Sequence, residues 1–246
     1  MGKSVFDVAS AIREKIKNGT YRFGFPIPSE RDLAETFQVN RTVIRNSLSL
    51  LTDEGLVKKI HGKGTYVTKT DIDDSVIHFK GMTELLKKAG YDPSSRILNT
   101  RVRKANYKFS KIFNVSPETD IFQILRLRLG SDRPISIENT YILYNSLKDI
   151  EKIDFQIFSL YDMFLINNIR IQDIRHVFST TRVHNTEARF LETEDSTPVI
   201  SIEITSLLAD RSVAEYTEAL VLPSFSKYYT DSIIKNGVYH INSQSF

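Results

Sequence analysis

Two arginines with strand spacing form the clearest candidate binding site in this sequence. Arg126 and Arg128 alternate with Leu125, Leu127 and Leu129. Alternate residues of a β-strand point to the same face, so the two guanidinium groups would lie side by side, opposite a leucine core. Guanidinium groups bind phosphate or carboxylate through charge-assisted hydrogen bonds. The pattern indicates an anion site; the alternative is a solvent-facing strand on which arginine only adds solubility.

A second arginine pair has helical spacing. Arg41 and Arg45 are four residues apart, with Thr42 beside the first, and apolar residues recur at 44, 48 and 51. Residues four apart lie on one side of a helix. A helix face that carries arginine can enter the major groove of DNA and bind guanine or phosphate. By itself such a pair is more often a solvated helix face.

The sequence predicts no catalytic site, metal site or cofactor. Its five histidines do not have metal-ligand spacing, and neither a Ser-His-acid pattern nor a cysteine is present. The stretch Gly62 to Thr65 resembles a phosphate loop only superficially, because the spacing and the following helix of such a loop are absent.

Composition and charge narrow the class of protein. With 246 residues, 41% of them hydrophobic, the chain can bury one large or two ordinary cores. The absence of cysteine fits a reducing cytoplasm, and no apolar run approaches the roughly 20 residues of a membrane span. Residues 1–70 hold 12 Lys and Arg against 7 Asp and Glu, whereas residues 71–246 hold 21 against 23. The basic head, residues 1–70, is followed by a nearly neutral body, residues 71–246. This difference suggests that the head binds a polyanion.

Two helices would precede the arginine-bearing one. Apolar residues at 5, 8, 9, 12 and 16 form one stripe of a first helix. Ser29 can cap a second helix, with Asp32 three residues on as its partner in a capping box. A turn at 38–40 then leads to a third helix, from about Arg41 to Glu54.

A short hairpin is expected after the third helix. Two β-prone runs, 56–60 and 65–68, flank Gly62, Lys63 and Gly64, which would form a bare, basic tip suited to phosphates or a minor groove. Helix, turn, helix and hairpin together are the pattern of a winged helix-turn-helix.

The body of the chain contains an apparent repeat. Residues 119–141 match residues 197–219 at a constant shift of 78. Each copy follows a β-prone run (96–103 and 174–183) and a short helix (109–114 and 186–191), and each reads as a hairpin. The pattern predicts an α+β domain with a central, mainly antiparallel sheet; two unrelated hairpins are the alternative. The repeat makes Tyr216 the counterpart of Glu138, so arginines, a carboxylate and a phenol would surround one cavity.

Residues 5–68 closely resemble the DNA-binding domain of GntR-type bacterial transcription regulators. The resemblance is carried by Pro28-Ser29-Glu30-Arg31, Arg41-Thr42-Val43-Ile44-Arg45, Glu54-Gly55-Leu56-Val57 and Gly62-Lys63-Gly64-Thr65-Tyr66-Val67. It implies contact with bases or phosphates and a wing tip that inserts near Gly64. The implied DNA-binding residues are Ser29, Arg31, Arg41, Thr42, Arg45, Lys63 and Gly64. Departures from the family at Asn40, Val43 and Lys63 concern which operator is read.

Residues 78–229 look like the UTRA effector-binding domain of the HutC branch of that family, whose fold resembles a chorismate lyase. The match is carried by Arg126-Leu127-Arg128, Ile137-Glu138, Ser159-Leu160-Tyr161 and Glu215-Tyr216, among others. In sugar-phosphate-sensing members, positions matching Thr83, Arg126, Arg128 and Ser159 hold the phosphate. Positions matching Glu138, Tyr161, Glu215 and Tyr228 hold the sugar. The string 224–229 departs from the family pattern around Tyr228.

These observations predict a cytoplasmic, ligand-responsive repressor that binds double-stranded operator DNA as a homodimer. The expected domains are a winged helix-turn-helix at 1–69, a linker at 70–76 and a UTRA-type effector and dimerisation domain at 77–246. A small anionic effector would release the operator, with a sugar phosphate favoured over a carboxylate such as an amino acid or organic acid. An enzyme of chorismate-lyase-like fold is the less favoured alternative. An architectural DNA-binding protein is disfavoured because a second domain of about 170 residues would then have no function.

Overall fold

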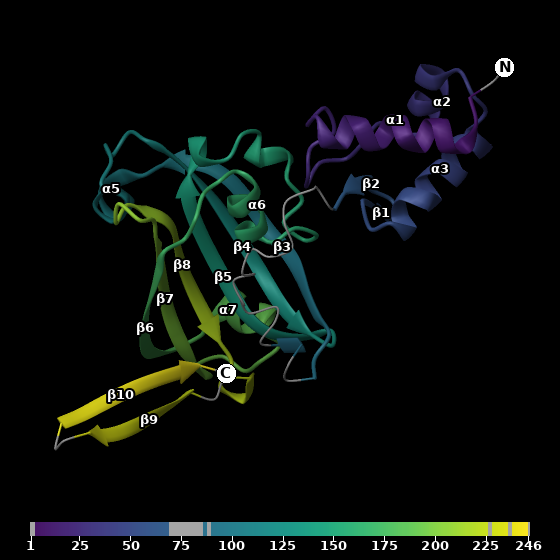
Figure 1. The fold of residues 1–246 in the computed structure, drawn as a ribbon. Coiled ribbons are helices and arrows are strands. Elements are labelled where there is room, and N and C mark those ends of the chain that lie inside the picture. The colour runs from purple at the N-terminus through teal and green to yellow at the C-terminus, as the bar shows by residue number, and fades with distance from the viewer. Residues whose placement is uncertain (1–2, 69–85, 88–89, 226–227, 236–237, 246) are drawn as a thin grey trace. The chain divides into compact units, whose positions relative to one another are not determined.

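The computed structural model divides into two compact units. It describes residues 3–68, 86–87, 90–225, 228–235 and 238–245, with side chains up to residue 225. One unit consists of residues 1–78 and 152–168, and the other of residues 79–151 and 169–246 (Figure 1). The predicted linker at 70–76 lies outside the described residues. None of the described helices is long and apolar enough to cross a membrane.

Three helices and a hairpin form most of the first unit, as the sequence predicts. The elements are α1 (Val5–Lys17), α2 (Glu30–Phe37), α3 (Arg41–Asp53), β1 (Val57–Ile60) and β2 (Gly64–Val67). Ser29 caps α2 in a capping box with Asp32, and Asn40 caps α3 by accepting the backbone N–H of Val43 at 2.9 Å. Asn40, one of the departures from the family pattern, therefore keeps the capping role.

The core of the first unit is the predicted apolar stripe of each helix. Val8, Ile12, Leu33, Ile44 and Leu51 are fully buried. The loop before α2 joins the hairpin, because the backbone N–H of Gly24 donates to Val67 and that of Ile27 donates to Thr65. The strand β2 is thus flanked on both sides. The unit also contains α6 (Leu160–Ile166), which Ser159 caps.

A six-stranded antiparallel sheet organises the second unit. Its strand order is β3-β4-β5-β8-β7-β6 (Figure 1). The bounds are β3 (Pro93–Lys104), β4 (Asp120–Gly130), β5 (Arg133–Leu143), β6 (Asp173–Arg182), β7 (Pro198–Leu207) and β8 (Val213–Val221). Helices α5 (Asn106–Phe113) and α7 (Asn185–Phe190), three 3-10 turns and a separate hairpin complete it. The 3-10 turns are η1 (Tyr144–Ser146), η2 (Ile150–Lys152) and η3 (Pro223–Phe225). The hairpin consists of β9 (Tyr228–Lys235) and β10 (Val238–Ser245).

The sheet consists of two halves with the same topology, but the sequence-derived register is wrong in one strand. Each half has a strand, a helix and a hairpin, and the hairpins have a bulge at the same place, after Arg128 and after Ser206. These bulges relate β4 to β7 by the expected shift of 78. Pairing then relates Ser136 in β5 to Glu215 in β8, a shift of 79, because the second turn is one residue longer. The counterpart of Glu138 is therefore Thr217 and not Tyr216.

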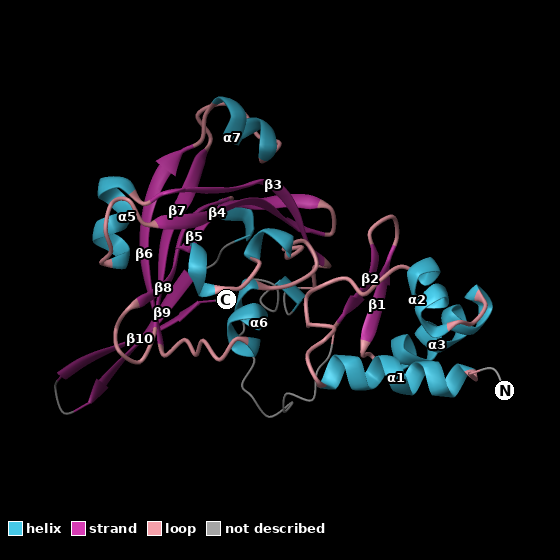
Figure 2. Cartoon of the chain, turned by 90° about the horizontal axis from the view of Figure 1, so that it is seen from above, coloured by secondary structure: helices cyan, strands magenta, loops and turns pink. Residues whose placement is uncertain are grey.

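Helices α5 and α7 pack on one face of the sheet, at opposite ends of the strands (Figure 2). Phe109 and Phe113 of α5 contact Ile121 and Tyr141, whereas Ala188 near α7's centre joins a separate apolar cluster. Strand alternation puts Arg126 and Arg128 on the opposite face. The predicted leucine core and arginine face are thus found on the expected sides.

Candidate DNA-binding and effector sites

The first candidate site is a group of basic side chains gathered around one carboxylate. Glu30, at the start of α2, lies 3.1 Å from Arg45 Nε and 3.8 Å from Arg41 Nη2, both on α3. Lys59 on β1 donates to the same carboxylate at 2.8 Å. Glu30 is 15% exposed, whereas its three partners are all more than 60% exposed. A mostly covered acid thus holds three solvent-facing cations on two elements.

The three basic side chains favour the ionised form of Glu30. The hydrogen bond from Lys59 is the main cause that lowers the pKa of Glu30 below its ordinary value, and Arg45 adds to it, while burial acts in the opposite direction. One carboxylate among three cations leaves a positive surface that joins α3 to the hairpin. Glu30 and Lys59 were missed by the sequence analysis, because their separation of 29 residues follows no helical or strand period.

The remaining predicted DNA-binding residues lie outside the group around Glu30 and have other contacts. The Ser29 hydroxyl is engaged in its helix cap, and Arg31 pairs with Glu35 at 3.1 Å. Thr42 is exposed on α3. At the hairpin tip, Lys63 Nζ lies 2.6 Å from Asp154 Oδ2. Gly64 has a φ of 119° and open space around a β-carbon position, so a partner can approach its backbone closely.

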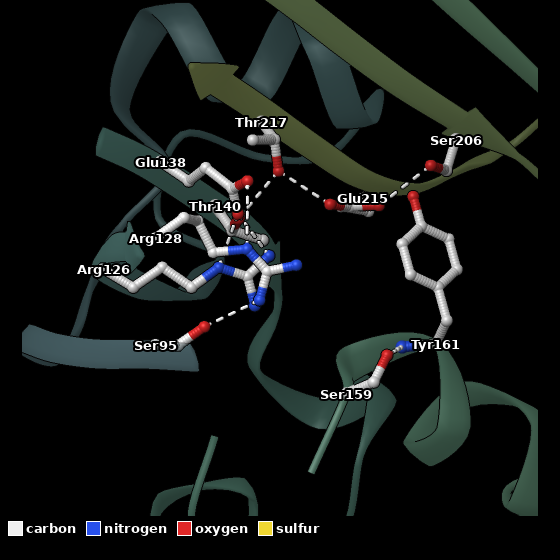
Figure 3. A network of polar contacts seen from close by, with 10 residues as sticks. All are labelled: Ser95, Arg126, Arg128, Glu138, Thr140, Ser159, Tyr161, Ser206, Glu215 and Thr217. Carbon is white, nitrogen blue, oxygen red and sulfur yellow. Dashed lines mark hydrogen bonds and ion pairs between the residues drawn. The ribbon is translucent and has the colours of Figure 1, made fainter. Parts of the chain in front are cut away.

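The second candidate site is a buried ion cluster on the sheet (Figure 3). Glu138 accepts from Arg126 Nε at 2.6 Å and lies 3.4 Å from Arg128 Nε. Arg128 Nη1 donates to Ser95 on β3 at 2.7 Å. The side chains of Arg126, Arg128 and Glu138 are 11%, 13% and 6% exposed. The alternative of a solvent-facing strand is therefore excluded for this stretch.

Charge pairing determines the protonation of this cluster. Burial alone would raise the pKa of Glu138, but the attraction of Arg126 and Arg128 outweighs it and leaves the pKa below its ordinary value. Burial is also the main cause that lowers the pKa of Arg128, partly offset by Glu138. With the acid ionised, its carboxylate binds both guanidinium groups.

Polar groups continue across the same face of the sheet. The hydroxyls of Thr140 and Thr217 lie 2.8 Å apart, and Thr217 donates to Glu215 at 2.7 Å. Ser206 donates to the other oxygen of Glu215 at 2.9 Å (Figure 3). Ser136, opposite Arg128 in the register, is fully buried, and its hydroxyl has no hydrogen-bond partner within the described part of the chain. A buried hydroxyl without a partner is destabilising, and a bound ligand can satisfy it.

Comparison with known families identifies both units. Residues 6–67 match the family described as bacterial regulatory proteins, gntR family, and residues 88–224 match the UTRA domain. The UTRA match covers more than half of the chain. The chain is a GntR-family transcription regulator with a UTRA domain. The predictions of this family, of the α+β fold and of a regulator rather than an enzyme are confirmed.

Relatives agree with this assignment. The transcriptional repressor NagR of Bacillus subtilis is 28% identical over 87% of this chain and 88% of its own length. The mannosyl-D-glycerate transport/metabolism system repressor MngR of Escherichia coli is 26% identical over 55% of this chain and 56% of its own. The crystal structure of PhnF from Mycobacterium smegmatis superposes with a TM-score of 0.57 at 21% identity, over 88% of this chain and 95% of that one.

The other predicted effector residues of the UTRA domain do not all join the arginine cluster. Glu215 lies on its face of the sheet, but Tyr216 points to the opposite face, where its ring lies near Tyr141. Burial and Glu218 raise the pKa of Tyr216. Ser159 and Tyr161 belong to the first unit, and their role stays a prediction. Thr83 and the side chain of Tyr228 lie outside the described residues.

The structure adds residues that the sequence analysis did not single out. Ser95, Ser136, Thr140 and Ser206 lie on the face of the arginine cluster or its polar continuation. Strand pairing could have found Ser136, because it lies directly opposite Arg128, but the pairing was not known from one sequence. Among the described residues, no group of three or more His, Asp or Glu has metal-binding geometry.

Proposed function

We propose that this regulator is a cytoplasmic repressor of the HutC branch that leaves its operator when its UTRA domain binds a small phosphorylated sugar. The observation that carries the proposal is the arginine cluster. Arg126 and Arg128 are largely covered and both bind the Glu138 carboxylate. Ser136, opposite Arg128 in the strand pairing, has a buried hydroxyl with no hydrogen-bond partner among the described residues. Such an arrangement suits an incoming anion that also accepts a hydrogen bond.

A phosphate group fits the charge of the cluster better than a neutral sugar does. A phosphate monoester carries up to two negative charges and several acceptor oxygens, so it can bind both guanidinium groups, with Ser95 and Ser136 as further donors. Glu138 would then turn from the arginines toward a sugar hydroxyl. Glu215, held by Ser206 and Thr217, would offer a second acceptor on the same face.

The rival effector is a carboxylate held by the same arginines. The name of MngR supports an anionic sugar derivative in general, because mannosyl-D-glycerate is a sugar joined to a carboxylate. A carboxylate has two oxygens in one plane and one charge, so it would satisfy one guanidinium well and leave the other paired with Glu138. The two effectors therefore differ in how far they depend on the second arginine.

The basic group around Glu30 supports DNA contact by α3 and the wing. Arg41 and Arg45 would reach bases or phosphates in the major groove, while Lys59 and the tip residues Lys63 and Gly64 follow the backbone. Glu30 would limit the rotamers of its partners before DNA arrives. This lowers the entropic cost of ordering them on the operator.

Dimerisation is supported by an uncovered edge of the UTRA sheet. Strand β6 is exposed along almost all of its length, with Val177 at 50% and Phe178 at 48% exposure. An exposed, partly apolar edge strand readily pairs with another chain. We propose that a second copy covers it, and that the dimer presents two α3 helices to half-sites about 34 Å apart. Sedimentation of the full chain tests this; a monomer at high micromolar concentration would refute it.

Calorimetry tests the effector. Hexose 6-phosphates, the same sugars without phosphate, and simple carboxylates are titrated into the wild type, Arg126→Ala and Arg128→Ala. Binding of a sugar phosphate that is lost in both variants is the expected result. Binding of a carboxylate alone, or unchanged sugar-phosphate binding in the variants, would overturn the phosphate proposal.

DNA binding is tested on an operator selected from random duplexes with the wild-type protein. Arg41→Ala and Arg45→Ala are each expected to weaken it with the fold intact, since both side chains are more than 60% exposed. A lost phosphate contact lowers the salt slope by about one, and a lost base contact relaxes specificity. If both variants bind like the wild type, α3 does not read the operator as proposed.

A further inference from the structure

A segment from far along the chain packs on the wing. Residues 152–168 group with the N-terminal unit, although they follow the first half of the UTRA sheet. Phe158, itself buried, contacts the ring of Phe23 at a centroid distance of 5.2 Å and that of Tyr66 at 6.0 Å. Tyr66 lies on β2, the second strand of the wing. The segment is thus anchored to the loop and the strand that form the wing.

The anchor depends on a close backbone approach at Gly24. A β-carbon at this position would lie 2.9 Å from the sulfur of Met163, and the residue has a φ of 81°. The backbone N–H of Gly24 also donates to Val67 on β2 at 3.0 Å. Any other residue would therefore strain the backbone and push Met163 away. This contact fixes α6 against the wing at a defined distance.

The same segment engages the wing tip. Lys63 Nζ lies 2.6 Å from Asp154 Oδ2 and 3.4 Å from Gln156 Oε1. The Asp154 carboxylate is oriented in advance, because its other oxygen accepts the backbone N–H of Gln156 at 3.0 Å. Its side chain is 16% exposed and that of Lys63 is 40% exposed. The lysine that would meet DNA phosphate is therefore held by an acid of its own chain.

We propose that Asp154 is an autoinhibitory residue that competes with operator phosphate for Lys63. The inference rests on the proposed contact of the wing tip with DNA. Lys63 carries one positive charge, which cannot neutralise both the Asp154 carboxylate, at 2.6 Å, and an operator phosphate, so the two anions compete for it.

Two substitutions with opposite expected effects on operator affinity test the competition between Asp154 and phosphate. Asp154→Asn keeps the oxygen that accepts from Gln156 but removes the charge, so it should tighten operator binding about two- to fivefold, as expected for a partly exposed ion pair. Gln156→Glu places a second carboxylate near Lys63 and should weaken binding by a similar factor. Both effects should disappear in a Lys63→Gln background, where no ammonium remains to be contested.

Controls separate this inference from the proposed function. Glu151→Gln removes an exposed negative charge three residues away and should leave operator affinity unchanged. Arg45→Ala reports whether the head binds DNA as proposed, whatever Asp154 does. The full-length protein is used throughout, with melting temperature as the check on folding. Equal gains from Asp154→Asn in the wild-type and Lys63→Gln backgrounds, or no gain while Arg45→Ala still weakens binding, would overturn autoinhibition by Asp154.

Discussion

Strands β3–β5 and strands β6–β8 build the two halves of the UTRA sheet on one plan, with a helix after the first strand and a bulge after the same position of the second. On the face away from the helices, however, the halves differ in chemistry. The first half has Arg126, Arg128, Ser136 and Glu138, and the equivalent positions of the second are Ile204, Ser206, Glu215 and Thr217.

The difference separates what the fold requires from what binding requires. In the second half the polar groups satisfy one another, since Glu215 accepts from both Ser206 and Thr217. In the first half two largely covered arginines bind the same carboxylate, and no described residue is a hydrogen-bond partner of the Ser136 hydroxyl. Because the second half keeps the same backbone without buried arginines, the arginines are not needed to make the sheet. They are therefore available to the proposed effector.

Loss of an arginine should have the largest effect. Arg126→Ala leaves Glu138 buried with one weaker partner, so the free energy of unfolding should fall by about 3–5 kcal/mol and sugar-phosphate binding should disappear. The matched change in the second half, Ile204→Val, should cost about 0.5–1.5 kcal/mol and leave ligand binding intact. Urea unfolding and calorimetry measure both. Equal stability losses and equal ligand affinities in the two variants would show that the halves are not functionally different.

The next effect is the pH dependence of stability at Glu138. Its folded-state pKa is lowered, so its ionised form stabilises the protein above the ordinary value of 4.5, and that contribution is lost as the pH falls through the folded pKa. Glu138→Gln should therefore be less stable than the wild type at neutral pH, and the gap should narrow in acid. Ile204→Val, which removes no group that a carboxylate uses, should change stability by the same amount at every pH. A Glu138→Gln gap that stays constant from neutral pH into strong acid would contradict the ion cluster.

A smaller effect is expected at the hydroxyl of Ser136. Because this group has no partner among the residues that the structure describes, Ser136→Ala should leave stability unchanged or raise it by up to about 1 kcal/mol. Sugar-phosphate affinity should fall roughly five- to tenfold, the equivalent of about one hydrogen bond. Ser206→Ala removes a hydroxyl that Glu215 already uses, so it should instead destabilise by about 1 kcal/mol. A destabilised Ser136→Ala with normal affinity would remove Ser136 from the site.

The smallest effect is expected at Tyr216. Its side chain lies on the opposite face from the arginines, so Tyr216→Phe should bind the effector like the wild type. The contacts of its hydroxyl with Glu218, at 3.5 Å, and with Glu203 are lost. Calorimetry on this variant tests whether the face that Tyr216 occupies excludes it from the site, since a clear loss of affinity would return Tyr216 to the effector-binding residues.

The extent to which the sequence predicted the structure differed between the two units. The head was predictable because caps, apolar stripes and the glycine-rich tip are local signals, and Ser29 and Asp32 form the expected capping box. The arginine face of β4 was predictable from strand alternation alone. The register of β8 was not, because a single extra residue in a turn changes which face a side chain occupies. Contacts such as Glu30 with Lys59, or Phe158 with Tyr66, join distant segments and leave no periodic trace.

The packing of Phe158 on the wing has a consequence for how the protein is made. The surface formed by Phe23, Gly24 and Tyr66 is complete once the first 70 residues leave the ribosome, but its cover follows about 90 residues later. At a synthesis rate of about 5–20 residues per second, the aromatic surface waits roughly 5–20 seconds for its partner. During that interval the nascent head offers a site that a chaperone can occupy, so the rate of translation between the two segments becomes a determinant of yield.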